Sequence, residues 1–233
     1  MFPPHTEATQ ATWTAVDEYY QDLYVKEDAI LDAASETAAA AGLPPISVSP
    51  TQGKFLNLLC KIVQARRVLE IGTLAGYSTI WLARALPDDQ ASKVVTLENN
   101  QVHARVAQRN IDHAGLSDRV DIKVGPALDI LPTIAKEEGH KPFDVIFIDA
   151  DKVNNKHYYE WALTLARPGS VIVMDNVVRD GKVLETDPTK QDPSTQGIRE
   201  FNDAVARDPR VSATALQTVG VKGYDGFALL LVN

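Results

Sequence analysis

From Arg66 onward the chain alternates short apolar segments with amphipathic ones at a regular spacing. The apolar segments resemble β-strands and read RRVLEIG, KVVTLE, RVDIKVG, FDVIFID and SVIVMDN. The segments between them place apolar residues at helical spacing and read YSTIWLARALP, QVHARVAQRNIDHAG, ALDILPTIAKEEG and KHYYEWALTLARPG. Strands that alternate with helices in this way predict an α/β fold with a doubly wound, mostly parallel sheet.

The flanking segments are expected to complete this fold. After the polar loop VVRDGKVLETDPTKQDPSTQG and the helix IREFNDAVARDP, the chain ends in SATALQTV and FALLLVN. The turn-rich GVKGYDG between those two segments predicts an antiparallel C-terminal strand pair, which makes the sheet seven-stranded.

The N-terminal part of the chain predicts extra helices. Residues 7–41 predict one or two helices outside the main fold, ending at Gly42 and a Pro-Pro pair. The following segment, SPTQGKFLNLLCKIVQA, predicts a helix with Ser49 or Thr51 as its N-cap. We therefore divide the 233 residues into a helical extension, 1–45, and one domain, 46–233.

Charge and composition exclude several classes of protein. The net charge is −8 and no basic stretch is longer than Arg66-Arg67, so nucleic acid is not expected as a partner. No apolar window is long enough for a membrane span, and the N-terminus lacks the pattern of a secretory signal. The single cysteine, Cys60, lies among apolar residues at helical spacing and is expected to be buried in the core. We expect a soluble, cytoplasmic protein without a membrane partner.

Polar residues concentrate at the carboxyl ends of the predicted strands, where open α/β sheets bind their ligands. Glu70 and Gly72 end the first strand, Glu98 the second, Asp149 the fourth, and Asp175-Asn176 the fifth. A single carboxylate at a strand end is more often a helix cap. Four of them at one edge of the sheet indicate a binding site.

The turn EIGTLAGYS and Glu98 together indicate a nucleoside site. Gly72 and Gly76 allow the backbone to approach a ligand, but the turn lacks the G-x-G-x-x-G spacing that holds a pyrophosphate. Glu98, at the end of the next strand, stands where an acidic residue accepts hydrogen bonds from ribose hydroxyls. A nucleoside without a pyrophosphate therefore fits this turn better than NAD.

Asp149, Asp175 and Asn176 form a second polar group, because the tips of the fourth and fifth strands are expected to converge. Two carboxylates and an amide oxygen suit Mg²⁺, which prefers oxygen ligands and keeps several waters. An isolated Asp-Asn pair is usually only a turn, but the nearby Asp149 favours a metal site. Lys152 starts the next helix and could accept a proton from a substrate hydroxyl in the same pocket.

These segments resemble the cation-dependent O-methyltransferases that use S-adenosylmethionine, the group of the catechol and caffeoyl-CoA O-methyltransferases. The likeness runs from Ile46 to the C-terminus. It is carried by SPTQGKFLNLL, VLEIGTLAGYSTIWLA, VVTLE, GPALDILP, FDVIFIDADK and VIVMDNVVRDGKV. The spacing of the carboxylates, 175 − 149 = 26 residues, matches the metal site of that family.

The resemblance implies a Rossmann-like methyltransferase fold, a homodimer and a role for each matching residue. Asp149, Asp175 and Asn176 would hold the divalent cation, and Lys152 would be the general base. Glu98 would bind the ribose, Ala127 would lie against the adenine, and Val48 would contact the methionine amino group through its backbone. The other residues implied to contact the cofactor are Glu70, Gly72, Thr73, Ser78, Asp149 and Asp151.

The resemblance also implies the reaction, which is transfer of a methyl group to a hydroxyl of a small vicinal-dihydroxy aromatic (catechol-type) acceptor. Val153-Asn154-Asn155 replaces the Asp-Asn-Tyr that follows DADK in plant caffeoyl-CoA enzymes, which argues against a coenzyme A thioester as acceptor. Two alternatives stay open from the sequence. One is a nicotinamide-dependent oxidoreductase on the same fold, and the other is a non-catalytic nucleoside-binding protein.

Overall fold

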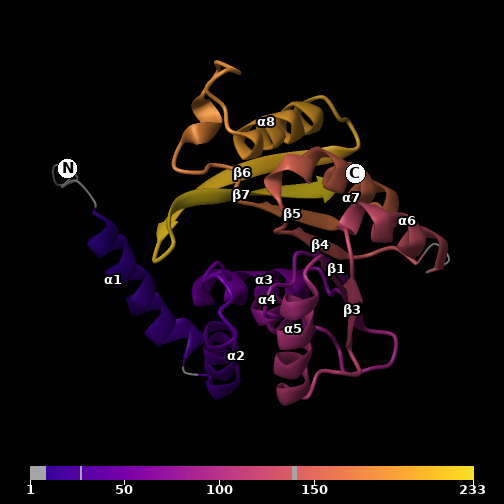
Figure 1. Ribbon diagram of the computed structural model, residues 1–233. Helices are drawn as coiled ribbons and strands as arrows, with labels where there is room; N and C mark the ends of the chain where they lie inside the picture. Colours follow the sequence, from indigo (N-terminus) through magenta and orange to yellow (C-terminus); the bar gives the residue numbers. More distant parts are fainter. Residues whose placement is uncertain (1–8, 27, 138–140) are drawn as a thin grey trace.

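One seven-stranded sheet forms the centre of the computed structural model, which describes residues 9–26, 28–137 and 141–233 (Figure 1). The strands are β1 Arg67–Ile71, β2 Lys93–Glu98, β3 Val120–Val124, β4 Val145–Ile148, β5 Val171–Asp175, β6 Val211–Gly220 and β7 Gly223–Val232. Their order is β3-β2-β1-β4-β5-β7-β6. Strands β1 to β5 are parallel, and β7 runs antiparallel to β5 and β6. The predicted doubly wound sheet with its antiparallel C-terminal pair is therefore confirmed.

Helices cover both faces of the sheet (Figure 1). The helical segments are α1 Gln10–Tyr20, η1 Gln21–Val25, α2 Ala29–Ala40, α3 Pro50–Ile62, α4 Tyr77–Ala83, α5 Gln101–His113, α6 Ala127–Glu137, η2 Lys152–Asn154, α7 Asn155–Leu165, η3 Lys182–Leu184 and α8 Pro193–Ala206. Val68 of β1 packs in one core layer with α3, α4 and α5, whereas Leu69 packs in the other with α6, α7 and α8. Consecutive apolar residues of a central strand are therefore buried on opposite faces, which explains the uninterrupted apolar runs.

Two helix starts illustrate the local signals. Ser49 is the N-cap of α3, where its hydroxyl accepts a hydrogen bond from Gln52 N at 3.2 Å, as predicted. Helix α8 begins at Pro193, so the expected extension of the polar loop to Gly197 is wrong. The reason is that Asp192 caps this helix by accepting from Thr195 N at 2.8 Å, and the proline fits its first turn.

The N-terminal helices divide into an outer and an inner part. Helix α1 has no buried residue and projects from the body of the molecule (Figure 1). In α2, Leu31 and Ala34 are buried in the same core layer as α4 and α5, so the expectation that this segment lies outside the main fold is wrong for α2. Its apolar residues cover a surface of the sheet domain that the sequence pattern did not identify. The division at residues 45/46 stays a prediction.

Two further sequence expectations concern the core and the membrane. Cys60 is buried on α3, where desolvation raises the pKa of its thiol to about 12. Over the described ranges, none of the helices is both long enough and apolar enough to cross a bilayer.

Candidate active site

A cleft of about 1080 Å³ opens at the carboxyl ends of β1, β2 and β4. The strand order runs outward from β1 in both directions, which makes this edge the switch point of the sheet. Ile71 pairs with both Leu97 and Ile148, so these strands end level with one another. The predicted residues that line the cleft are Val48, Gly72, Thr73, Ser78, Glu98, Ala127, Asp149, Asp151, Lys152 and Asn176.

Two predicted site residues are buried and do not line the cleft, Glu70 and Asp175. Glu70 is fully buried and accepts hydrogen bonds from Ser78 Oγ at 2.6 Å, Thr79 Oγ1 at 2.5 Å and Thr96 Oγ1 at 2.6 Å. Desolvation raises the pKa of its carboxyl group to about 7, although the three hydroxyls oppose that rise. Glu70 thus binds the first turn of α4 and the neighbouring strand β2 from inside the core. Its connection to the cleft is its hydrogen bond with Ser78, which lines the cleft.

Gly72 lines the cleft at the end of β1, next to the end of β4. Its φ is +106°, and a Cβ there would lie 2.2 Å from the carbonyl oxygen of Asp149. The sequence predicted close backbone approach to a ligand at this glycine. The structure shows that the close approach is to the end of β4, so a side chain at residue 72 would push the two strand ends apart.

Glu98 holds the loop that follows β1. Its two carboxylate oxygens accept hydrogen bonds from Leu74 N and Asn100 N, each at 2.8 Å, and its side chain still reaches the cleft. The Nδ1 atom of His103 lies 3.6 Å from Oε1. A carboxylate has about four acceptor positions, so these bonds leave capacity for hydroxyl groups of a ligand.

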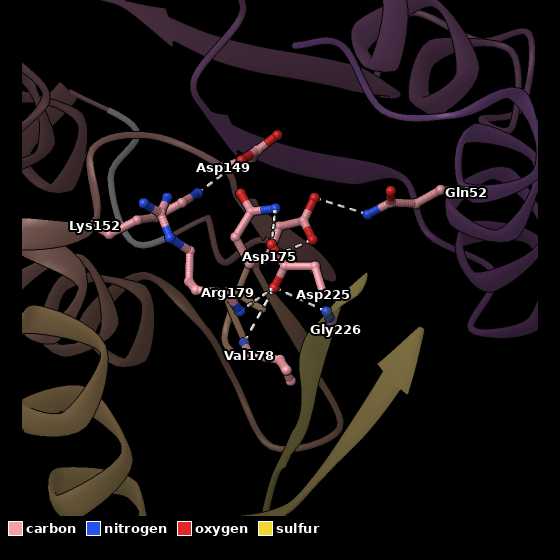
Figure 2. Close-up of polar contacts among 9 residues, drawn as sticks. Gln52, Asp149, Lys152, Asp175, Val178, Arg179, Asp225 and Gly226 are labelled. Carbon is pink, nitrogen blue, oxygen red and sulfur yellow. Dashed lines mark hydrogen bonds and ion pairs between the residues drawn. The ribbon is translucent and has the colours of Figure 1, made fainter. Parts of the chain in front are cut away.

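The acidic half of the cleft joins the ends of β4 and β5. Ile148 pairs with Met174, so Asp149 and Asp175 follow at neighbouring tips, as the sequence predicted (Figure 2). Lys152 Nζ donates to Asp149 Oδ1 at 2.8 Å, and the residue as a whole is only 7% exposed although it lines the cleft. Burial and the charge of Asp149 raise the pKa of Asp175 to about 7.

The chemistry of this group fits a hard divalent cation. Burial and the charge of Asp149 disfavour the ionised form of Asp175, and a cation would offset both effects. Among the described residues, Asn176 Oδ1 receives no hydrogen bond, so a hard oxygen acceptor is left available. Within the same ranges, no three His, Cys, Asp or Glu side chains gather as a metal centre, and this set would hold a cation through two carboxylates and one amide.

Asp151 is an exposed residue that lines the cleft beside Lys152. Its carboxylate accepts hydrogen bonds from Tyr158 Oη at 2.5 Å and from Asn154 Nδ2 at 2.6 Å. Desolvation and the neighbouring carboxylate raise the pKa of Tyr158, so the phenol stays a hydrogen-bond donor. The first turn of α7 is thereby bound to the part of the cleft that Asp151 lines.

Two residues in contact with the acidic group were missed by the sequence reasoning. Gln52 Nε2, on α3, donates to Asp175 Oδ2 at 2.8 Å (Figure 2). Asp225, on β7, accepts from Asn176 Nδ2 at 3.1 Å and also lines the cleft. Neither has a local signal: Gln52 lies in the first turn of a helix, and Asp225 lies in a segment that reads as a turn.

Comparison with known proteins decides the family. The O-methyltransferase family profile matches residues 21–231. The chain belongs to the O-methyltransferase family. It is 56% identical to a catechol O-methyltransferase of Niastella koreensis, over 94% of this chain and 97% of that one. It is 52% identical to a catechol O-methyltransferase of Mycobacterium tuberculosis, over 94% of this chain and 95% of that one.

A solved structure supports the same assignment. The O-methyltransferase from Bacillus cereus in complex with SAH superposes with a TM-score of 0.92 and 56% identity, covering 97% of this chain and 100% of that one. The predicted enzyme class is confirmed, so both the oxidoreductase and the non-catalytic alternative are set aside. In this O-methyltransferase, residues from the segments VLEIGTLAGYS, VVTLE, GPALD and FIDADK line the same cleft.

Proposed function

We propose that this O-methyltransferase transfers a methyl group from S-adenosylmethionine to a hydroxyl of a small catechol-type aromatic, with a divalent cation. The observation that carries the proposal is one continuous cleft with two halves. One half presents Glu98 and the β1 turn, and the other presents Asp149, Lys152 and Asn176. The relatives named catechol O-methyltransferase and the SAH complex of the Bacillus cereus enzyme support the same pair of ligands.

The nucleoside half is proposed to bind S-adenosylmethionine, which supplies the methyl group as a sulfonium. Glu98 would accept hydrogen bonds from the ribose hydroxyls, Ala127 would pack against the adenine, and the Val48 backbone would receive the amino group. Glu70 would act through Ser78, because its own carboxylate is enclosed by hydroxyls. The further cofactor contacts proposed are Gly72, Thr73, Asp149 and Asp151.

The acidic half is proposed to bind Mg²⁺ or another hard divalent cation through Asp149, Asp175 and Asn176. The cation would supply Lewis acidity and fix the orientation of both oxygens of a vicinal diol. Lys152 is proposed as the general base that takes the proton of the reacting hydroxyl. Its Nζ atom donates a hydrogen bond to Asp149 Oδ1 at 2.8 Å, which holds the amine in this half of the cleft.

Two further proposals concern the setting of the enzyme. We propose a homodimer, supported by apolar side chains left exposed on α1 and η1. We also propose a cytoplasmic location, supported by a single cysteine that is buried and forms no disulfide. Cell fractionation with an antibody against the chain would test the location.

The decisive experiment is a methyl-transfer assay with S-adenosylmethionine and a panel of catechols, including the matching monophenols. We expect turnover of the catechols and almost none of the monophenols, because one hydroxyl cannot chelate the cation. A chelator should abolish turnover, and added Mg²⁺ should restore it. Full activity in the presence of chelator would overturn the role of the cation, and absence of turnover across the panel would overturn the acceptor class.

The same assay tests Lys152 with two replacements. Lys152→Met keeps the length of the side chain without its amine and should lower turnover by about 10²–10⁴-fold. Lys152→Arg keeps the charge and the pairing with Asp149 but cannot accept a proton, so it should lower turnover as well. Affinity for SAH should stay near that of the wild type in both. An active arginine variant would show that residue 152 acts through its charge alone.

A further inference from the structure

Asp225 binds the turn after β5 more extensively than any role in strand pairing requires. Its Oδ1 atom accepts backbone hydrogen bonds from Val178 at 3.1 Å, Arg179 at 2.9 Å and Gly226 at 2.9 Å (Figure 2). Its Oδ2 atom accepts from the side-chain amide of Asn176 at 3.1 Å. One carboxylate of β7 therefore binds two backbone N–H groups and one side-chain amide of the turn that carries a proposed ligand.

The backbone of this turn needs such an anchor. Asn176, Arg179 and Asp180 have φ values of 57°, 54° and 53°, in the left-handed region that side chains disfavour. Backbone in that region persists only where the surroundings enforce it. Main-chain bonds from Val177 N to Gly226 O at 3.0 Å and from Asp180 N to Tyr224 O at 3.1 Å add to the hold of β7 on the turn.

The bond between Asn176 and Asp225 also decides which way the amide faces. An ionised carboxylate only accepts hydrogen bonds, so the NH₂ of Asn176 must face Asp225. The amide oxygen, on the opposite side of the group, is then directed away from Asp225. Asn176 lines the cleft, and its oxygen has no donor among the residues that the structure describes.

We propose that Asp225 is a positioning residue that makes Asn176 present its oxygen, and not its NH₂, to the divalent cation. This inference rests on the proposed function, because it assumes that the cation binds at Asp149, Asp175 and Asn176. Asp225 itself is not assigned as a ligand, since its carboxylate already accepts four hydrogen bonds, which take up its about four acceptor positions. Removing its charge should act on the cation through the amide of Asn176.

The first variant is Asp225→Asn. The new side chain can keep its oxygen toward the backbone N–H groups, which leaves its own NH₂ facing the NH₂ of Asn176. Because two donors cannot pair, the Asn176 amide should rotate and turn its NH₂ toward the cation. We expect Mn²⁺ affinity, measured by calorimetry or electron paramagnetic resonance on the SAH-bound protein without acceptor, to fall about 10–100-fold. SAH affinity should stay unchanged.

The second variant exchanges the two groups, Asn176→Asp with Asp225→Asn. Residue 176 can then accept from the new amide with one oxygen and offer the other to the cation, so Mn²⁺ affinity should return to near the wild-type value. Asn176→Asp alone places two carboxylates face to face and should not keep that affinity. The double variant preserves the hydrogen bonds of the turn, so it remains informative if Asp225→Asn folds poorly.

The outcomes separate the alternatives. Wild-type Mn²⁺ affinity in Asp225→Asn overturns the proposal, and so does a double variant that fails to recover affinity, which would make Asp225 a ligand or a purely structural anchor. A wild type that binds no Mn²⁺ contradicts the proposed function instead. In that case the amide orientation is still read without metal, from the ¹⁵N-labelled side-chain NH₂ signals of Asn176. They should move in Asp225→Asn, and unmoved signals would overturn the positioning role.

Discussion

Glu70 should make the stability of the protein fall as the pH rises. In the folded state its pKa is raised from 4.5 to about 7, because burial disfavours the charge more than the three hydroxyls favour it. Between these two values the unfolded chain releases a proton that the folded protein keeps. The free energy of unfolding therefore falls as the pH rises from 4.5 to about 7, by about 3 kcal/mol in total. Below pH 4.5 Glu70 is protonated in both states and does not reduce the stability.

Glu70→Gln isolates this contribution, because glutamine has nearly the same shape and does not titrate. Denaturant unfolding of both proteins between pH 5 and 8 should show the variant gaining stability relative to the wild type as the pH rises. Asp175 has its pKa raised into the same range, but it is present in both proteins and cancels in the difference. A difference that does not change with pH would contradict the assignment of a raised pKa to Glu70.

At the scale of elements, the contact between α8 and η2 should control the position of Lys152. A Cβ at Gly197 would lie 2.2 Å from Lys152 O and 2.8 Å from Val153 Cα. Alanine favours a helix over glycine by about 1 kcal/mol, but overpacking against a backbone that cannot rotate away costs about 1–3 kcal/mol. We expect Gly197→Ala to be net destabilising by about 1 kcal/mol and to lower methyl-transfer turnover more than SAH affinity.

The matched control for this contact is Glu200→Ala, an exposed position on the same helix. Its stability should stay within about 0.5 kcal/mol of the wild type, and its turnover should not change. Chemical denaturation and the catechol assay measure both quantities. A Gly197→Ala variant more stable than the wild type, with unchanged turnover, would show that α8 can move without disturbing the general base.

Helices and strands that have a local sequence pattern could be predicted from the sequence. Contacts between residues that are far apart in the sequence could not. The segment FDVIFID reads as a buried strand because both of its faces are covered, and parallel pairing then places Asp149 beside Asp175. Asp225 meets Asn176 across 49 residues and Gln52 meets Asp175 across 123, through packing that no local pattern encodes. For the same reason residues 7–41 predicted helices but not the core layer in which Leu31 is buried.

At the scale of the whole molecule, apolar surface remains uncovered on one side of the N-terminal region. The exposed fractions on α1 and η1 are 49% for Val16, 60% for Tyr19, 45% for Tyr20, 47% for Leu23 and 65% for Tyr24. The ring centroids of Tyr19 and Tyr20 lie 5.3 Å apart and those of Tyr20 and Tyr24 lie 5.7 Å apart, so the three tyrosines form one exposed cluster. Monomeric proteins rarely leave such a cluster in water, and a second copy of the chain would cover it.

If the proposed homodimer uses this cluster, charge placed within it should separate the subunits. In analytical ultracentrifugation the wild type should have a molecular mass of twice 25.5 kDa. The double variant Tyr19→Glu with Tyr24→Glu should have a mass of 25.5 kDa, because two carboxylates would have to be desolvated in the interface. Gln108→Glu with Gln196→Glu adds the same charge on the exposed faces of α5 and α8 and should leave the dimer intact. A wild type that sediments as a monomer contradicts the dimer. A tyrosine variant that stays dimeric places the interface elsewhere, for which the exposed edge strand β6 is the next surface to test.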